Sequence, residues 1–289
     1  MMRRSLAALF LAAACSTAPE DASPVAPSAA VYNDPSRIDT IGLADLIVDQ
    51  KSTENKWRVK NENLSGSFCS VQEGGVTPGN RRLLRFTVTT PNIGDADVYI
   101  GSPLDHYNAN DGLYELSTCH DHFHFQNYAT YSLIGVTDGK VWRSAKQGFC
   151  MLDTDPYNTI YRDSPRNYWS CGTLSVDGFQ GISKGWSDTY LWYLGGQYFV
   201  LDGGDGQEVV PAGWYYIQVE VNPAYAANGK KACPRVTDPA TGLCHQFTES
   251  NYANNTMRVT IYVPASGPAG PYKNDPDPTA ADEIEHSGR

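Results

Sequence analysis

Three of the six histidines in this 289-residue chain fall close together, at His120, His122 and His124. In a strand, side chains at every second position lie on one face, so the three imidazoles would converge while Phe123 and Phe125 face the core. Neutral imidazoles with coordination positions left open suit Cu(II) or Zn(II), and iron is the third metal that this donor set admits. The spacing predicts a metal site; the alternative is a polar outer face that carries histidines by chance.

The elements around this segment are expected to be strands. Asp138-Gly139, between the strand-like runs 128–136 and 140–143, is a β-hairpin signal. Apolar residues also recur at every second position, which is the period of half-buried strands, in 84–88, 215–221 and 257–263. The last two of these runs are expected to pair, and Arg85 is expected on the outer face of the first. The predicted fold is mainly β, an antiparallel β-sandwich-like single domain with long loops and few short helices.

Composition and charge narrow the class of protein. Hydrophobic residues make up 41% and charged residues 19%, as in a folded globular domain. The 22 basic and 32 acidic residues give a net charge of 22 − 32 = −10. Because there is no stretch rich in Lys and Arg, we expect no nucleic-acid partner.

The N-terminal residues are typical of an export signal. A basic head, Met1–Arg4, precedes the nine apolar residues Leu6–Ala14, which is the length of a signal-peptide core and too short to span a bilayer. Ala12-Ala13-Ala14-Cys15 resembles a bacterial lipobox, so we expect lipidation of Cys15 and a bacterial cell-envelope lipoprotein that meets the membrane only through its lipid anchor. The alternative is a secreted, extracellular protein.

The expected organisation follows from composition. Residues 1–15 are the signal peptide with its lipobox, 16–35 a flexible linker rich in Ala, Pro and Ser, 36–264 a single folded domain, and 265–289 a disordered acidic tail. Beyond Cys15 the chain has an even number of cysteines, which in an exported protein indicates disulfides: Cys69, Cys119, Cys150, Cys171, Cys233 and Cys244. Only the pair Cys233–Cys244, which brackets a turn-rich loop, is suggested locally.

The histidine segment, read from Glu115 to His124, resembles the copper motif of the lysyl oxidases. That motif has the form Glu-x-x-x-Cys-His-x-His-x-His followed by a Tyr-rich strand, which corresponds here to 128–133. Further segments resemble the family in the same order along the chain, from about residue 41 to 263: 43–46, 83–86, 146–150, 187–190, 213–217 with 221–225, and 249–255. The chain is therefore similar to lysyl oxidases over most of its length, as a bacterial lysyl oxidase-like protein.

The resemblance implies an enzyme, a copper-dependent amine oxidase. His120, His122 and His124 would hold copper(II), and Lys146 and Tyr190 would form the cofactor lysine tyrosylquinone. Its substrates would be O₂ and a primary amine or a lysine-containing protein, and its products an aldehyde, NH₃ and H₂O₂. Without the resemblance, Lys146 would be a surface lysine and Tyr190 an ordinary core aromatic.

Other residues stay open at this stage. Asp188 shares a strand face with Tyr190, so it is either the catalytic base or a turn or capping residue. Glu115 is either a partner that orients a ligand histidine or a surface acid. Ser117 stands where the vertebrate pattern has a histidine. Cysteines that the family has soon after Cys150 and around Tyr190 are missing.

The resemblance also implies a disulfide between Cys119 and Cys171, which leaves Cys69 with Cys150. Two other classes of protein remain as alternatives. One is a non-catalytic copper-binding surface lipoprotein, in which Lys146 and Tyr190 stay uncrosslinked. The other is an adhesive or structural sandwich in which the histidines hold nothing.

Overall fold

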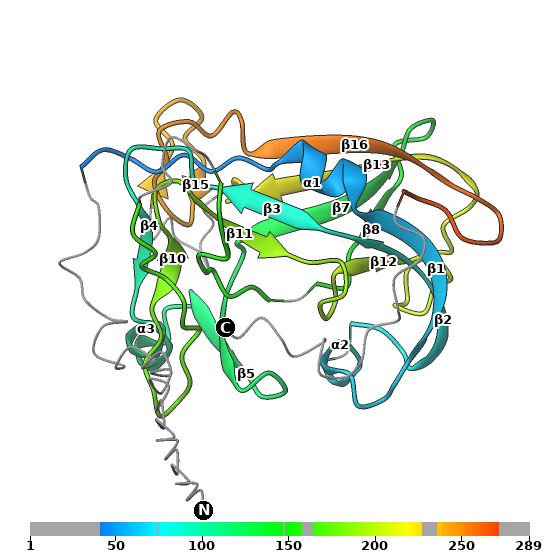
Figure 1. The fold of residues 1–289 in the computed structure, drawn as a ribbon, viewed down its shortest axis with the longest axis horizontal. Coiled ribbons are helices and arrows are strands. Elements are labelled where there is room, and N and C mark those ends of the chain that lie inside the picture. The colour runs from blue at the N-terminus through cyan, green and yellow to red at the C-terminus, as the bar shows by residue number, and fades with distance from the viewer. Residues whose placement is uncertain (1–40, 74, 147, 158–163, 227–235, 272–289) are drawn as a thin grey trace, which may run out of the picture.

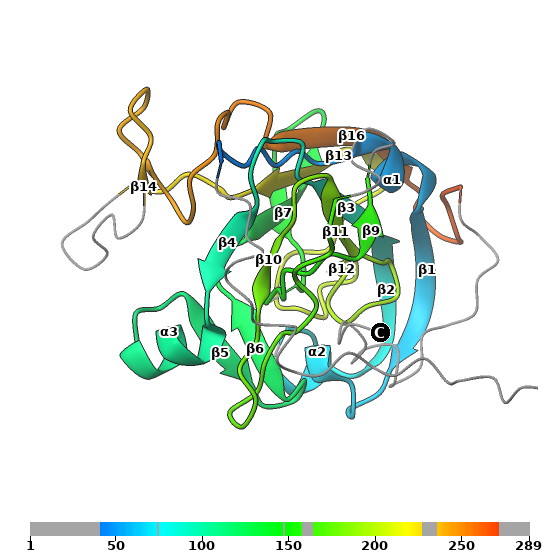
Figure 2. The same ribbon diagram turned by 60° about the vertical axis from the view of Figure 1, so that its left-hand side comes forward.

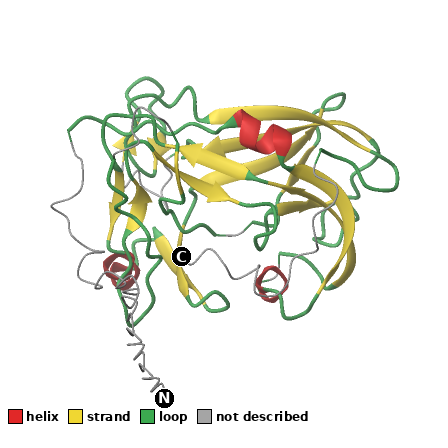
Figure 3. Ribbon diagram, in the orientation of Figure 1, coloured by secondary structure: helices red, strands yellow, loops and turns green. Residues whose placement is uncertain are grey.

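The computed structural model describes residues 41–73, 75–146, 148–157, 164–226 and 236–271. The predicted export signal, Cys15 and the linker at 16–35 lie outside these residues. Strands dominate, and the described helices are short: α1 (Gln50–Asn55), α2 (Cys69–Gln72) and α3 (Pro103–Ala109) (Figure 3). The predicted fold class, mainly β with antiparallel sheets and one domain, is confirmed. In the described part of the chain, no helix has the length and apolar character needed to cross a membrane.

The largest sheet has the strand order β16-β13-β7-β8. Its strands are β7 (Ala129–Gly135), β8 (Val141–Arg143), β13 (Gly213–Val221) and β16 (Thr256–Val263). The expected alternation is present, and Ile217 lies opposite Val259 with both side chains buried. Burying each such side chain stabilises the fold by about 1.5–3 kcal/mol. The predicted hairpin joins β7 to β8, with Gly139 at a φ of 67°.

Two further sheets pack against this one (Figure 1). The first has the order β1-β2-β12 and the second β3-β11-β9. Their strands are β1 (Trp57–Leu64), β2 (Gly79–Phe86), β3 (Val88–Pro91), β9 (Asp155–Pro156), β11 (Trp186–Tyr190) and β12 (Tyr198–Val200). Phe86 of β2 stacks on Phe199 of β12 at 4.9 Å and meets Tyr131 of β7 edge-on at 5.3 Å. The main core therefore lies between the layers, as in a sandwich.

Three two-stranded sheets complete the fold. They pair β4 (Val98–Gly101) with β10 (Gln180–Ile182), β5 (Tyr114–Ser117) with β6 (His122–Phe125), and β14 (Val236–Thr237) with β15 (Cys244–His245). Figure 2 shows the β5–β6 hairpin between α3 and α2, at the end of the molecule away from β16. This hairpin carries the histidine motif.

Arg85 departs from the sequence expectation. It was expected on a solvated face of β2, but its side chain is completely buried. Its guanidinium forms two hydrogen bonds with the carboxylate of Glu62, at 2.9 and 2.7 Å, and donates to the carbonyl oxygen of Trp192. The alternation in the sequence was read correctly, but the segment after β11, whose Trp192 and Leu194 carbonyl oxygens accept hydrogen bonds from Arg85, covers the other face of β2.

The ordered domain also extends beyond the predicted boundary at residue 264. Ala269 forms an antiparallel bridge with Val59, in which each backbone N–H donates to the other's carbonyl oxygen. Gly270 has a φ of +106°, and a Cβ there would lie 2.3 Å from the carbonyl oxygen of Trp57. Residues 265–271 therefore belong to the domain, and the rest of the predicted tail lies outside the described residues.

Two expected disulfide pairings are wrong. Cys69 is bonded to Cys119 and Cys150 to Cys171, whereas the resemblance had implied Cys119–Cys171 and left Cys69–Cys150. Of the predicted Cys233–Cys244 pair, Cys244 is disulfide-bonded, and its expected partner lies outside the described residues.

The reason for the observed pairing is the backbone on either side of β6. Phe125 donates its N–H to the carbonyl oxygen of Phe149, and Phe123 donates to that of Gly172. These two contacts bring the segments that contain residues 150 and 171 together, with a Cα–Cα distance of 5.6 Å. Residue 119 lies in the turn before β6 and faces α2, where it meets Cys69.

Candidate active site

The three histidines lie together at the start of β6. His122 and His124 are on the strand and buried, whereas His120 precedes it in a turn in which Asp121 has a left-handed φ of 53°. The ring centroid of His120 lies 5.4 Å from that of His122 and 5.1 Å from that of His124. The centroids of His122 and His124 are 5.1 Å apart. The three rings converge, but the strand supplies only two of them and the turn supplies the third.

Gly148 packs directly against this cluster. A Cβ at this position would lie 2.1 Å from Nδ1 of His124. Only a glycine allows the backbone at residue 148 to pass so close to the imidazole. This close approach fixes His124 from the side opposite β5.

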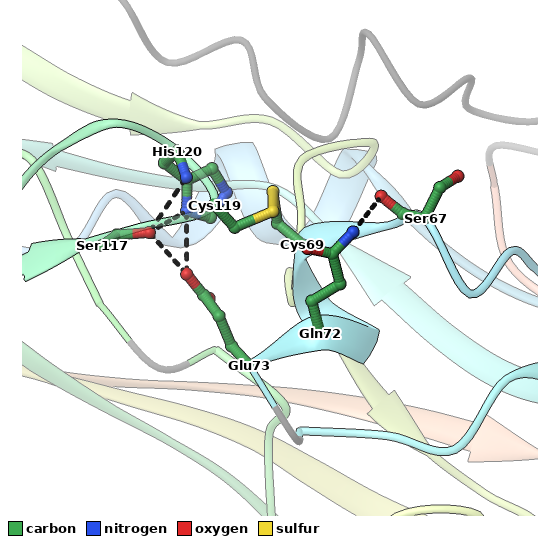
Figure 4. Close-up of a disulfide and its surroundings, with 7 residues drawn as sticks. All are labelled: Ser67, Cys69, Gln72, Glu73, Ser117, Cys119 and His120. Atoms are coloured by element: carbon green, nitrogen blue, oxygen red, sulfur yellow. Dashed lines mark hydrogen bonds and ion pairs between the residues drawn. A yellow bond between two sulfur atoms is a disulfide. The ribbon is translucent and has the colours of Figure 1, made fainter.

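A carboxylate that the sequence did not predict also lies here (Figure 4). Glu73 follows α2, and its Oε1 lies 3.2 Å from Nδ1 of His120. The hydroxyl of Ser117 donates to the same oxygen at 2.5 Å and lies 2.9 Å from the same ring nitrogen. Burial disfavours the charge of Glu73, but the hydrogen bonds from His120 and Ser117 outweigh it and hold the pKa of this carboxyl below its usual value.

The donor set fits a transition metal. Ligand atoms of Glu73, His120 and His124 all lie within 4.8 Å of one another, and the ring of His122 lies beside them. Imidazoles with a carboxylate nearby suit Cu(II) or Zn(II). Glu115, the carboxylate considered from sequence, is exposed and outside this group. No sequence signal indicated Glu73, because the Cys69–Cys119 bridge that joins α2 to the histidine turn is known only from the structure.

Lys146 and Tyr190 lie next to each other. Nζ of Lys146 is 5.1 Å from the centroid of the Tyr190 ring and 5.5 Å from that of Phe149. Tyr190 ends β11 and is almost completely buried, and its hydroxyl donates to the carbonyl oxygen of Cys150 at 2.9 Å. The Cys150–Cys171 bridge therefore anchors the backbone that holds this phenol. An amine this close to a phenol ring fits the two precursors of a crosslinked quinone.

Asp188 lies two residues before Tyr190 and is completely buried. Burial, and then the nearby charge of Asp188, raise the pKa values of the Tyr128, Tyr131 and Tyr190 phenols. The ring of Phe149 packs edge-on against all three tyrosines, with centroid distances of 5.3–5.6 Å. Phe149 and the three tyrosines form an aromatic box that Lys146 borders, and the Asp188 carboxylate lies near its phenols.

A cavity of about 790 Å³ reaches Lys146 from the surface. Phe149 and Tyr131 line it on the side of the aromatic box, and Arg143, Asp205 and Gln207 line its outer part. Gln207 closes part of this wall, because its side-chain amide pairs with the backbone N–H and carbonyl of Arg143. The volume suits a side chain or a small amine that enters toward Lys146.

The positions of these residues correspond to a known family. The sequence profile described as lysyl oxidase matches residues 45–232. The chain belongs to the lysyl oxidase family. Similar proteins include lysyl oxidase homolog 2 of Gallus gallus, 29% identical over 224 residues, which are 74% of this chain and 24% of that protein. Lysyl oxidase homolog 3B of Danio rerio is 25% identical over 225 residues, 74% of this chain and 23% of that protein.

The chain thus spans about a quarter of the length of these curated relatives. The family match covers α1 through β13 and includes the histidine hairpin, Lys146 and Tyr190. It therefore covers every residue of the cluster described above.

Proposed function

We propose that this protein is a copper-dependent amine oxidase that converts primary amines, including lysine side chains, to aldehydes. The overall reaction is RCH₂NH₂ + O₂ + H₂O → RCHO + NH₃ + H₂O₂. The observation that carries the proposal is the placement of Nζ of Lys146 5.1 Å from the Tyr190 ring, in a chain whose three histidine rings also converge. Neither a binding module nor a structural sandwich requires this pairing.

The histidines and the two crosslinking side chains have separate tasks. His120, His122 and His124 would hold copper(II), and copper with lysine tyrosylquinone supplies the oxidising chemistry when both are in place. Lys146 would provide the amine that adds to the Tyr190 ring, which copper and O₂ must first oxidise because an unoxidised phenol does not react with an amine. The hydrogen bond from the Tyr190 hydroxyl to the Cys150 carbonyl oxygen holds the outer end of the phenol, and Nζ of Lys146 lies 5.1 Å from the ring centroid.

The remaining residues would bind and orient the substrate. The amine would enter through the cavity beside Lys146, whose lining includes Phe149 and Tyr131. Asp188, which is buried and lies two residues before Tyr190, would accept a proton from the α-carbon of the substrate. Asp188→Asn is therefore expected to form the crosslink, as detected by mass, yet to turn over amines much more slowly.

Two substitutions test the proposed function. Tyr190→Phe removes the phenol oxygen, and Lys146→Arg replaces the amine with a guanidinium, which is a far poorer nucleophile. Both variants should bind copper but produce no amine-dependent H₂O₂. Matched controls at exposed positions, Tyr262→Phe and Lys140→Arg, should retain wild-type turnover.

Wild-type peroxide production by Lys146→Arg would exclude the lysine crosslink and favour a quinone made from tyrosine alone. No peroxide from the copper-loaded wild type with any primary amine would instead favour a copper-binding surface lipoprotein without a quinone.

The proposed location is the bacterial cell envelope, with Cys15 lipidated. Two acyl chains give stable anchoring where one chain gives only marginal binding. Cys15→Ser should therefore move the protein from the membrane fraction to the soluble fraction. Unchanged membrane association of this variant would contradict lipid anchoring, and a wild type released to the medium would favour the secreted alternative.

A further inference from the structure

We propose that Glu73 is a positioning residue of the metal centre, which holds the Nδ1–H of His120 so that this histidine binds the metal through Nε2. The inference rests on the proposed function only in taking the histidines as metal ligands. It assigns a role to a residue outside the histidine motif.

The hydrogen bonds determine which nitrogen of His120 carries the proton. The hydroxyl of Ser117 donates to Oε1 of Glu73 at 2.5 Å, so the Ser117 oxygen is left to accept. It accepts from the backbone N–H of His120 at 3.1 Å and lies 2.9 Å from Nδ1. Glu73 lies 3.2 Å from the same nitrogen. Both neighbours of Nδ1 are thus acceptors, so Nδ1 is the protonated nitrogen and Nε2 the metal ligand.

A partner of this kind matters most for His120. His122 and His124 are fixed by the β6 backbone, and Gly148 packs against His124. His120 lies in the turn before the strand, where backbone pairing does not set the direction of its ring. A carboxylate that accepts the second N–H of a ligand histidine fixes the tautomer and raises the basicity of the ring.

The disulfide explains how Glu73 reaches this position. Cys69 is the first residue of α2, and Glu73 directly follows the last residue of this helix. The Cys69–Cys119 bond joins α2 to the histidine turn and so brings the Glu73 carboxylate to His120 (Figure 4).

The test is copper binding by the full-length protein, measured by competition with a chelator and independently of quinone or peroxide. Glu73→Gln keeps the shape of the side chain and removes its charge, so the fold should be retained. We expect Cu(II) affinity to fall about 10- to 100-fold. Glu115→Gln is the matched control, because Glu115 lies opposite His124 in the β5–β6 register but is exposed; its affinity should match the wild type.

A spectroscopic measurement distinguishes positioning from a general structural effect. Pulsed electron paramagnetic resonance of the Cu(II) protein detects the remote nitrogen of each bound imidazole. In Glu73→Gln we expect three bound histidines, with a changed quadrupole coupling for one remote nitrogen. Ser117→Thr, which keeps the hydroxyl, should preserve the signal, and Ser117→Ala should change the same nitrogen.

Three outcomes would overturn the proposal. One is wild-type affinity and an unchanged spectrum in Glu73→Gln. Another is an equal loss of affinity in Glu115→Gln. The third is loss of a directly bound oxygen with all remote nitrogens unchanged, which would make Glu73 a ligand. Each result is read on copper alone, so it stands whether or not the protein oxidises amines.

Discussion

Removing the Cys69–Cys119 bridge should lower both the stability of the fold and its affinity for copper. The two cysteines are 50 residues apart in sequence. Breaking a disulfide that closes a loop of this length gives the unfolded chain more conformational entropy. In the chain-entropy model, this lowers the free energy of unfolding by about 4 kcal/mol at 25 °C. For a domain of this size that corresponds to a fall in melting temperature of roughly 8–16 °C.

The Cys69→Ser/Cys119→Ser variant tests this, and the second bridge provides the matched control. Cys150 and Cys171 are 21 residues apart, so the same model gives a loss of about 3 kcal/mol for their removal. Denaturant unfolding should show similar losses for the two variants. Their functions should differ: the first releases α2 and Glu73 and weakens copper binding, whereas the second loosens the backbone that holds the Tyr190 hydroxyl and impairs crosslinking.

Two results would refute this reasoning. Disulfide mapping of the wild type that recovered Cys69 joined to Cys150, or Cys119 joined to Cys171, would show that the pairing is wrong. Equal copper affinities in the wild type and the Cys69→Ser/Cys119→Ser variant, with a normal melting temperature, would show that the bridge positions nothing.

Glu62→Gln should destabilise the fold by about 3–5 kcal/mol in denaturant unfolding, because it leaves the buried Arg85 guanidinium without its partner. Burial opposes the charge of Glu62, but Arg85 holds the pKa of the Glu62 carboxyl below its usual value. The ion pair therefore stabilises the fold at pH values above the pKa of Glu62 in the unfolded chain. This stabilisation is lost as the pH falls through the pKa of Glu62 in the folded protein. Unfolding curves between pH 7 and acid should show a steeper loss in the wild type than in the variant, and parallel curves would count against the assignment. Gly148→Ala should reduce copper content and should lower stability by about 1–3 kcal/mol, because the added Cβ meets His124. The control Gly66→Ala, whose Cβ would contact nothing within 4 Å, should change neither quantity. Normal copper content in both variants would contradict the close packing at Gly148.

Much of the fold could be predicted from local sequence, because period-two alternation and turn residues act over short distances. The strands at 215–221 and 257–263 pair as expected, and the Asp138–Gly139 turn joins β7 to β8. The burial of Arg85 could not be predicted, because alternation shows that a strand has an apolar and a polar face but does not show whether other parts of the chain cover the polar face as well. Its partner Glu62 lies on the neighbouring strand opposite Arg81 and not opposite Arg85, so no local pattern indicates the 2.7 Å ion pair.

The candidate site shows the same division. The histidine spacing indicated a cluster, and the family resemblance named Lys146 and Tyr190, which lie next to each other in the structure. Glu73 and the disulfides depend on contacts between segments far apart in sequence. Counting cysteines gives no pairing, and the pairing that was implied does not join α2 to the histidine turn as the Cys69–Cys119 bond does.

The most direct test of the account is mass analysis of the protein produced with copper in air. Peptides that contain Lys146 and Tyr190 should be recovered as one crosslinked species, with an oxygen atom gained and hydrogen lost relative to the separate peptides. The same species should be absent from the Tyr190→Phe and His122→Ala proteins. Recovery of unmodified, separate peptides from copper-loaded wild type that nevertheless oxidises amines would contradict the account.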